Sequence, residues 1–224
     1  KILNESFPRI PFIEAMEKYG SDKPDLRNPL IIRDITNTFS RDDVKFDIFK
    51  KLVKSGAKVK AIITKKTKDK PRSFFDNLDK WAKSQGASGL AYFTLEKEKK
   101  ITAKGPVGKF FSSEALIEIM KITGAKAGDS IFFSCDKKPN VLQLMSSTRD
   151  KIANELDLID HNVFAFCWIV DYPMYELDNT TGKIKFSHNP FSMPQGEEKK
   201  LDLKNPLNIK AYQYDIVCNG IELS

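Results

Sequence analysis

Apolar and polar positions in the middle of the chain switch repeatedly between a strand-like and a helix-like period. Runs rich in β-branched and aromatic residues, which are typical of strands, occupy residues 58–66, 89–97 and 129–136. Segments with apolar residues at helical spacing occupy residues 73–86, 111–124 and 140–158. Because the two kinds alternate between about residues 30 and 160, the pattern predicts one compact two-layer α/β unit there.

Specific residues mark the expected helix ends. Ser73 and Asp76 have the spacing of a capping box at the start of the first helix of this unit, and Gly86 follows its end. Ser112 is placed to cap the second helix in the same way. Ahead of the unit, in the segment 9–20, Pro11 is placed at a helix start and Gly20 at its end, which predicts a short amphipathic helix.

From residue 163 onward the pattern changes to long strand candidates rich in aromatic residues. These candidates are residues 163–177, 182–191 and 209–223. No amphipathic helix separates them, and the sequence DNTTG between the first two is a turn signal, so they predict an antiparallel sheet. The predicted fold class is therefore α+β, with a two-layer α/β insertion followed by part of a sheet-based domain.

Composition places the chain among folded proteins. Its 224 residues are 41% hydrophobic and 30% charged, and no run of eighteen apolar residues or signal peptide is present. We therefore expect a soluble, cytoplasmic protein without a membrane segment. Its three cysteines lie far apart in apolar runs, which favours buried thiols over a disulfide or a zinc site. The chain begins without methionine and stops directly after a strand-like run, so we expect a piece of a larger protein.

The net charge of +7 is unevenly distributed. Residues 163–224 carry six lysines and eight acidic residues, a net charge of −2, so residues 1–162 carry the remaining +9. Such a basic region is compatible with a surface that faces a polyanion. It is equally compatible with a lysine-rich solvated surface, and the sequence leaves both interpretations open.

Three residues are candidates for chemistry. His188 precedes a turn in SHNPF, where an imidazole can line a cleft, although a structural hydrogen-bonding role is the alternative. Asp215 and Glu222 would face opposite sides of a regular strand, but Asn219 and Gly220 between them indicate a bend that could bring both carboxylates to one cleft. Two carboxylates suit magnesium that carries ATP phosphates, and ordinary surface acids remain the alternative.

Five motifs occur in the order and rough spacing found in one enzyme family. They are YGSDKPDLR, GAKAGDSIFFSCD, WIVDYPMYE, SHNPFSMP and YDIVCNGIEL. Together they resemble bacterial-type aspartyl-tRNA synthetases, and the resemblance covers essentially the whole chain. Residues 30–160 look like the GAD domain, an insertion that also occurs in some tRNA-dependent amidotransferase subunits. Residues 1–29 and 161–224 are similar to parts of the class II synthetase catalytic domain, whose core is an antiparallel sheet.

The resemblance implies a two-step ligase reaction. L-aspartate reacts with ATP to give aspartyl-adenylate, and the aspartyl group then passes to tRNA(Asp), with tRNA(Asn) as a further candidate. By similarity, His188 contacts the aspartate substrate, while Asp215 and Glu222 hold ATP and its Mg²⁺. No residue of this chain is assigned a catalytic role beyond binding. The resemblance also implies a cytoplasmic homodimer for the full-length protein.

The chain departs from the family pattern in two ways. Asn189 stands where many members have a second histidine, so a charged role at that position is not expected. The chain also has no counterpart of the arginine-bearing motif that binds the α-phosphate, nor of the glycine-rich strand expected after NGIEL, so we expect the isolated 224 residues to be inactive. For Lys23, Asp25 and Arg27 in GSDKPDLR, an ion pair that holds the junction of core and insertion is favoured over substrate contact.

A second function remains in competition. The chain could be a non-catalytic, tRNA-associated GAD-type module of an amidotransferase-like protein, because that domain also occurs there and residues 1–162 are basic. Such an adaptor has no need for SHNPF followed by YDIVCNGIE in the last third of the chain. The sequence therefore favours the ligase over the adaptor, and over a third interpretation in which the insertion is only a spacer.

Overall fold

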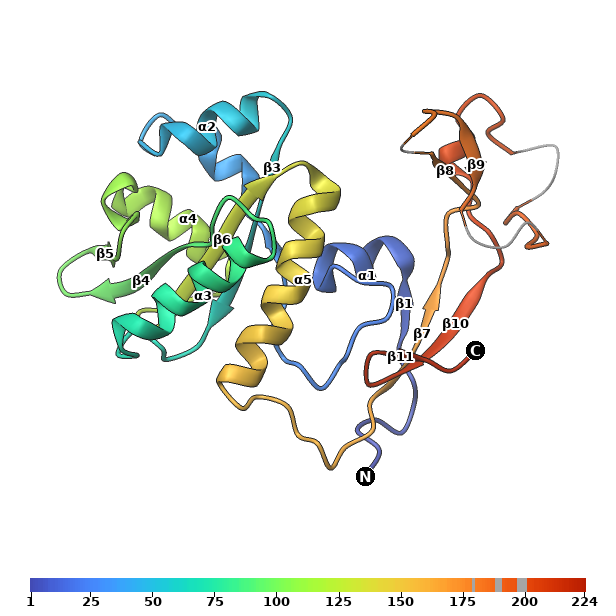
Figure 1. Ribbon diagram of the computed structural model, residues 1–224, viewed down its shortest axis with the longest axis horizontal. Helices are drawn as coiled ribbons and strands as arrows, with labels where there is room; N and C mark the ends of the chain where they lie inside the picture. Colours follow the sequence, from blue (N-terminus) through green and yellow to red (C-terminus); the bar gives the residue numbers. More distant parts are fainter. Residues whose placement is uncertain (179, 188–190, 197–200) are drawn as a thin grey trace. The chain divides into compact units, whose positions relative to one another are not determined.

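A computed structural model describes residues 1–178, 180–187, 191–196 and 201–224 (Figure 1). The chain divides into two compact units. The first, here called the sheet unit, comprises Lys1–Met16, Ser21–Arg27 and Asp160–Ser224. The second, the insertion unit, comprises Glu17–Gly20 and Asn28–Ile159. Within the described residues no helix has both the length and the apolar character needed to cross a membrane.

The insertion unit is built on a five-stranded antiparallel sheet with the strand order β2-β3-β6-β4-β5. Its strands are β2 (Arg33–Asp34), β3 (Lys58–Thr64), β4 (Ala91–Lys97), β5 (Ile101–Lys104) and β6 (Ser130–Asp136). Strands β3 and β6 pair along their whole length, from Lys58 opposite Asp136 to Thr64 opposite Ser130. Their side chains are buried on both faces, which explains the near-continuous apolar runs in the sequence.

Helices cover both faces of this sheet (Figure 1). They are α2 (Asp47–Lys54), α3 (Arg72–Ser84), α4 (Ser113–Thr123) and α5 (Lys138–Glu155), with 3₁₀ turns at Thr36–Ser40 and Gly108–Phe110. On β6, Phe132 packs in the core formed with α3 and α5, whereas its neighbour Phe133 packs in the core formed with α2 and α4. The predicted α+β class is confirmed, and the insertion, expected to have two layers, has a further helical layer on the second face of its sheet.

Helix ends agree with the sequence in one case and differ in another. Ser112 caps α4, because its Oγ accepts a hydrogen bond from the Ala115 amide at 3.0 Å, and Gly124 ends this helix with φ of 74°. The capping box predicted at Ser73 is wrong. The helix begins at Arg72, directly after Pro71 in an extended conformation, so Ser73 already lies inside the first turn and makes no cap.

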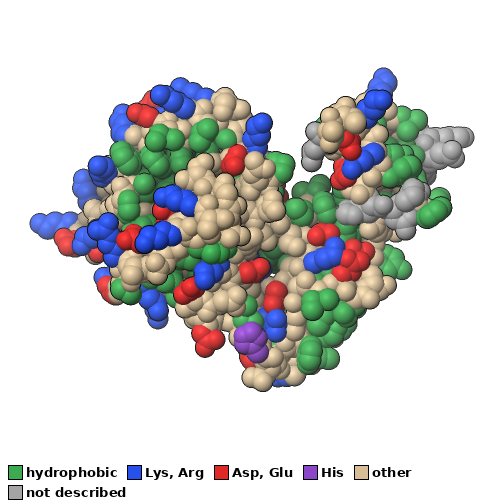
Figure 2. All heavy atoms as spheres, viewed as in Figure 1, with side chains coloured by type: hydrophobic (Ala, Val, Ile, Leu, Met, Phe, Trp, Pro, Cys, Tyr) green, Lys and Arg blue, Asp and Glu red, His purple; other side chains and the backbone are tan. Residues whose placement is uncertain are grey.

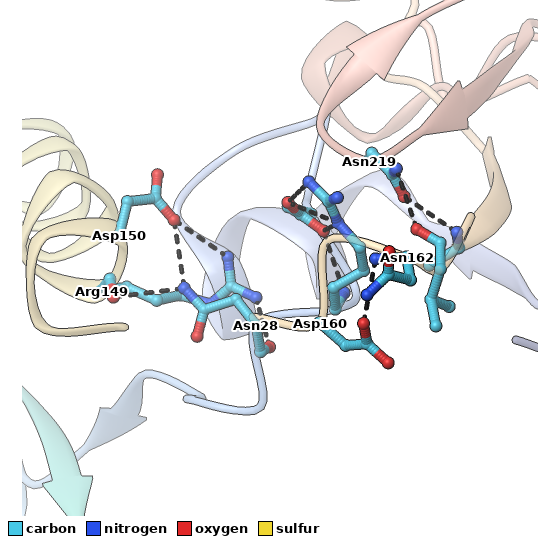
Figure 3. A network of polar contacts seen from close by, with 10 residues as sticks. Asn28, Arg149, Asp150, Asp160, Asn162 and Asn219 are labelled. Atoms are coloured by element: carbon cyan, nitrogen blue, oxygen red, sulfur yellow. Dashed lines mark hydrogen bonds and ion pairs between the residues drawn. The ribbon is translucent and has the colours of Figure 1, made fainter. Parts of the chain in front are cut away.

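A buried arginine ties the segment ahead of β2 to α5. The Arg149 side chain is only 2% exposed and donates a hydrogen bond of 2.7 Å to the Leu30 carbonyl oxygen. It also donates one of 2.8 Å to the carbonyl oxygen of Asn28, which lies beside it (Figure 3). The Asn28 amide returns hydrogen bonds to the Arg149 carbonyl and to Asp150, and the guanidinium lies 5.1 Å from the ring of Tyr19. These contacts offset the free-energy cost of burying the positive charge of the Arg149 guanidinium.

A buried lysine holds the last turn of α1 (Phe12–Tyr19), whose residues from Glu17 onward belong to the same unit. The Lys60 side chain on β3 is 1% exposed and its ammonium pairs with Glu17 and, at 3.0 Å, with Asp34. Burial alone would lower the pKa of Lys60, but these hydrogen bonds raise it above its ordinary value. Gly20 follows with φ of 70°, and a Cβ there would come within 2.5 Å of the Leu142 carbonyl oxygen, so only glycine fits.

The sheet unit contains a four-stranded sheet with the order β1-β7-β10-β11. Its strands are β1 (Arg9–Pro11), β7 (Phe166–Val170), β10 (Tyr214–Cys218) and β11 (Ile221–Glu222). β1 is parallel to β7, and the remaining pairs are antiparallel. The second predicted strand does not join this sheet: β9 (Ile184–Phe186) pairs with β8 (Tyr175–Leu177) in a separate hairpin, and a 3₁₀ turn follows at Pro206–Asn208.

The three cysteines are free thiols, as the sequence predicted. Cys135 and Cys167 are buried, and burial raises the pKa of each thiol to about 11. Cys218 is only partly buried. Burial therefore makes the first two thiols unreactive near neutral pH.

Basic side chains are spread over the visible face of the insertion unit with acidic ones among them (Figure 2). Some basic residues of this unit form ion pairs: Arg41 contacts Asp43 at 2.8 Å and Glu118 at 2.6 Å, and Lys104 contacts Glu96 at 2.8 Å. The Arg41 guanidinium also holds the pKa of Asp43 well below its usual range. Part of the basic charge is thus neutralised within the unit.

Replacing Arg149 tests its role in the insertion unit. We expect Arg149→Ala to lower the free energy of unfolding by about 3 kcal/mol, because two buried carbonyl groups lose their donor. Lys151→Ala, on the same helix but more exposed, should change it by less than about 0.5 kcal/mol. Urea unfolding followed by circular dichroism measures both, and equal effects of the two substitutions would contradict this role.

Candidate functional site

A two-residue turn connects β10 to β11. Asn219 and Gly220 both have positive φ, 53° and 83°, which is the conformation of a type I′ hairpin turn. The turn sets Cys218 opposite Ile221 and Val217 opposite Glu222. The Asn-Gly signal therefore produces a tight antiparallel hairpin rather than a bulge in one long strand.

The side chain of Asn219 anchors this turn to the segment that leads into β7 (Figure 3). Its Oδ1 accepts a hydrogen bond from the Ala165 amide at 2.8 Å, and its Nδ2 donates one to the Val163 carbonyl at 3.2 Å. Its own amide donates to the Ala165 carbonyl at 3.1 Å. Asparagine thus meets two requirements here, because it tolerates positive φ and satisfies backbone groups of the neighbouring strand.

The hairpin brings Asp215 and Glu222 to one face of the sheet. Residues directly opposite one another in an antiparallel pair share a face, so Glu222 lies on the same side as Val217. Asp215 precedes Val217 by two positions and shares that side as well. In one continuous strand Asp215 and Glu222 would face opposite sides of the sheet. Because the turn at Asn219 and Gly220 reverses the chain between them, the two residues share a side instead.

Asp215 lies in a buried, hydrogen-bonded position. The residue is 9% exposed, and the Tyr172 hydroxyl donates a hydrogen bond of 2.6 Å to its Oδ2. Burial and the neighbouring carboxylate together raise the pKa of Tyr172, so this residue stays protonated and acts as a donor. The Tyr172 ring is fully buried and contacts the ring of Phe12 from α1, with centroids 4.9 Å apart. Asp215 is thereby held in a fixed orientation.

Glu222 is more exposed and pairs with a lysine. Its side chain is 41% exposed, and its Oε2 lies 2.9 Å from the Lys23 ammonium, which also contacts Asp22 at 3.0 Å. Partial burial would lower the pKa of Lys23, but its hydrogen bonds to Glu222 and Asp22 raise it. Lys23 is therefore charged throughout the physiological pH range.

The loop that supplies Lys23, residues 20–27 with the sequence GSDKPDLR, is internally hydrogen-bonded. Ser21 Oγ accepts from the Lys23 amide at 3.0 Å, and Asp25 accepts from the Arg27 amide at 2.9 Å. The Arg27 guanidinium also forms a bidentate pair with Asp25, at 3.0 and 2.7 Å. Lys23, Asp25 and Arg27 thus all form ion pairs, with Lys23 directed to Glu222 rather than to Asp25. The expectation that such a pair holds the junction of core and insertion stays a prediction.

The donor set fits a magnesium ion shared with phosphate oxygens. Among the described residues, no group of three His, Cys, Asp or Glu side chains is arranged to hold a metal ion by itself. Mg²⁺ is usually held by one or two carboxylates together with water and substrate phosphates. Asp215 and Glu222 on one face supply that number of carboxylates, so the site suits a metal–nucleotide complex better than a protein-only metal centre.

His188, the third predicted site residue, lies outside the described residues, as does its neighbour Asn189. The hairpin β8–β9 precedes them, and the Ser187 amide donates to the Met174 carbonyl at 3.0 Å. The predicted contact of His188 with aspartate therefore stays a prediction.

The sequence did not identify Tyr172 as a site residue, and it expected an ion pair of Lys23 without placing it at Glu222. Tyr172 and Lys23 bind the two carboxylates, and both lie in motifs that the sequence singled out, WIVDYPMYE and YGSDKPDLR. Their partners are 43 and 199 positions away, a separation that periodicity does not reveal. In the sequence, only the presence of Tyr172 and Lys23 within these two motifs indicated that they could belong to the site.

Removing the Tyr172 hydroxyl tests the orientation of Asp215. We expect Tyr172→Phe to lower the free energy of unfolding by about 2 kcal/mol, because the buried carboxylate loses a donor while the ring is kept. The exposed Tyr214 offers a matched control, and Tyr214→Phe should have almost no effect. Thermal and urea unfolding would show the difference, and a Tyr172→Phe protein as stable as the parent would refute the contact.

Comparisons with known proteins show which sequences this chain is similar to. Residues 49–145 match the family model described as the GAD domain. The aspartate–tRNA(Asp/Asn) ligase of Pelagibacter ubique is 73% identical over 224 residues, which is 100% of this chain and 38% of the relative. Ligases of the same name from Gluconobacter oxydans and Beijerinckia indica are 51% and 50% identical, over 100% and 99% of this chain and 37% of each relative.

The chain spans about 38% of the length of the curated relatives it matches. Its last third, which carries the two carboxylates, is included in the match. The resemblance that the motifs indicated is confirmed: residues 49–145 match the GAD domain model, and the chain is similar over its whole length to a segment of aspartate–tRNA(Asp/Asn) ligases.

Proposed function

We propose that the chain is part of an aspartate–tRNA ligase, which activates L-aspartate with ATP to aspartyl-adenylate and transfers it to tRNA in protein biosynthesis. The main support is the 73% identity to such a ligase along the entire chain. The β10–β11 hairpin adds a geometric argument, because it sets two carboxylates on one face, and Mg²⁺ bound to phosphates is usually held by one or two carboxylates.

Asp215 and Glu222 are proposed to hold ATP and its Mg²⁺. The metal, when bound, would offset the negative charge of the phosphates. Tyr172 fixes the orientation of Asp215, so this carboxylate needs little reorganisation before it binds. Glu222 sits at the more accessible end of the same face, beside Lys23. The protein thus contributes position and charge rather than a covalent intermediate.

His188 is proposed to contact the aspartate substrate. An imidazole at the end of a strand can donate a hydrogen bond or carry a positive charge, and both suit a carboxylate. The amide of Asn189 beside it can form hydrogen bonds but adds no charge.

The proposed partners follow from the names of the relatives. These names give tRNA(Asp) and tRNA(Asn), and we propose both as candidates for this chain. The cytoplasmic homodimer proposed for the full-length protein rests on the family resemblance alone. The alternative, a non-catalytic GAD-type module of an amidotransferase-like protein, is not favoured, because the match to the ligases includes the sheet unit as well as the GAD domain.

A chimeric ligase tests the residue roles. This chain would replace the matching segment of the Pelagibacter ubique ligase, and Asp215→Asn and Glu222→Gln would be introduced separately. Each should raise the KM for ATP by about 10- to 100-fold, because a charged ligand is lost, with a much smaller change for aspartate. His188→Ala should instead raise the KM for aspartate much more than the KM for ATP. Glu5→Gln, at an exposed carboxylate, serves as the control. Equal changes in both KM values would contradict the assigned roles.

The isolated chain provides a separate test. We expect the purified 224 residues to show no aspartate-dependent exchange of pyrophosphate into ATP, because the arginine-bearing motif that contacts the α-phosphate has no counterpart in the sequence. The chimeric ligase is the positive control. Exchange above background by the isolated chain would show that these residues suffice for adenylate formation and would refute the expectation.

A further inference from the structure

The GSDKPDLR loop has no role in the function proposed above, yet it contacts the proposed nucleotide site directly. The Lys23 ammonium lies between two carboxylates, 2.9 Å from Oε2 of Glu222 and 3.0 Å from Oδ2 of Asp22. All three side chains are partly exposed, so water and ions can reach them. Lys23 therefore occupies a position beside Glu222 that a free cation could otherwise take.

Negative charge accumulates on this side of the sheet unit. Tyr172 hydrogen-bonds Asp215, and the negative charges of Asp22 and Glu222 also raise its pKa, so all three carboxylates lie within electrostatic range of one hydroxyl. Within the described part of the chain, Lys23 is the cation whose ion pairs join two of these three acids. A group of acids of this kind attracts divalent cations unless a positive charge is already present.

The loop holds Lys23 in place at its backbone. The Lys23 amide donates to Ser21, and the bidentate pair between Arg27 and Asp25 braces the second half of the loop. The loop also packs against the β10–β11 turn: a Cβ placed on Gly220 would lie 3.5 Å from the Asp25 Cβ. Lys23 is therefore not a lysine of a mobile surface loop that pairs by chance.

We propose that Lys23 is a built-in counter-ion of the Asp22–Glu222 carboxylate pair, which competes with a divalent cation for Glu222. This inference rests on the proposed nucleotide site and adds a means of control to it. Lys23 neutralises the pair when no nucleotide is present, and its charge disfavours a free divalent cation at close range. Its three N–H donors allow it to turn to another anion, such as a phosphate group, when one is available.

Binding of Mn²⁺ to the 224-residue chain, measured by electron paramagnetic resonance of the free ion, tests this competition. We expect Lys23→Met to bind Mn²⁺ about tenfold more tightly than the parent chain, because a positive charge at close range is removed from a partly exposed site. The double substitution Lys23→Met with Glu222→Gln should abolish this gain. Lys210→Met removes a lysine that pairs with Asp171 elsewhere in the sheet unit and should leave the affinity unchanged.

Several results would overturn the proposal. They are unchanged or weaker Mn²⁺ binding by Lys23→Met, a gain that persists in the double variant, and the lack of detectable binding in every variant. Lys23→Gln, which keeps the length and hydrogen bonding of the side chain, replaces Lys23→Met if circular dichroism shows that the latter is unfolded. A different result would contradict the proposed nucleotide site. If Glu222→Gln left the KM of the chimeric ligase for ATP unchanged, Glu222 would not hold ATP, and this result does not depend on the Mn²⁺ affinity of the Lys23 variants.

Discussion

The left-handed conformation of Asn219 and Gly220 is the constraint on which the arrangement of the site depends. A side-chain period of two means that a shift of one residue moves a carboxylate to the opposite face of a strand. The two-residue turn fixes the register of β10 and β11. In this register Glu222 lies opposite Val217, on the face of the sheet that also carries Asp215. Without this turn, the same sequence would separate the two acids.

Polar contacts then give each carboxylate a different environment. Asp215 is buried and accepts a hydrogen bond from Tyr172, whereas Glu222 remains accessible and pairs with Lys23. A buried acceptor with a fixed donor is preorganised, and an accessible acceptor with a charged partner can exchange that partner. The two acids of one face are thereby suited to different tasks, one to fixed positioning and the other to exchange of cations.

The sequence predicted most of the fold and part of the site. Periodicity located the helices and buried strands of the insertion unit, and Ser112 correctly marked the start of α4. Local patterns did not reveal that Pro71 moves the start of α3, nor that the strand before His188 pairs in a separate hairpin, because both depend on context beyond a short window. Likewise, the contacts of Lys23 with Glu222 and of Arg149 with Leu30 join residues far apart in the chain, which composition and spacing cannot show.

The central claim, that the two carboxylates of the hairpin form one metal–nucleotide site, can be tested by anomalous diffraction. A crystal of the chimeric ligase grown with Mn²⁺ and a non-hydrolysable ATP analogue locates the metal without reference to activity. The account predicts a manganese peak on the face of the sheet that carries Asp215 and Glu222, within coordination distance of at least one of them. A peak elsewhere, with both carboxylates still bound only to Tyr172 and Lys23, would contradict it.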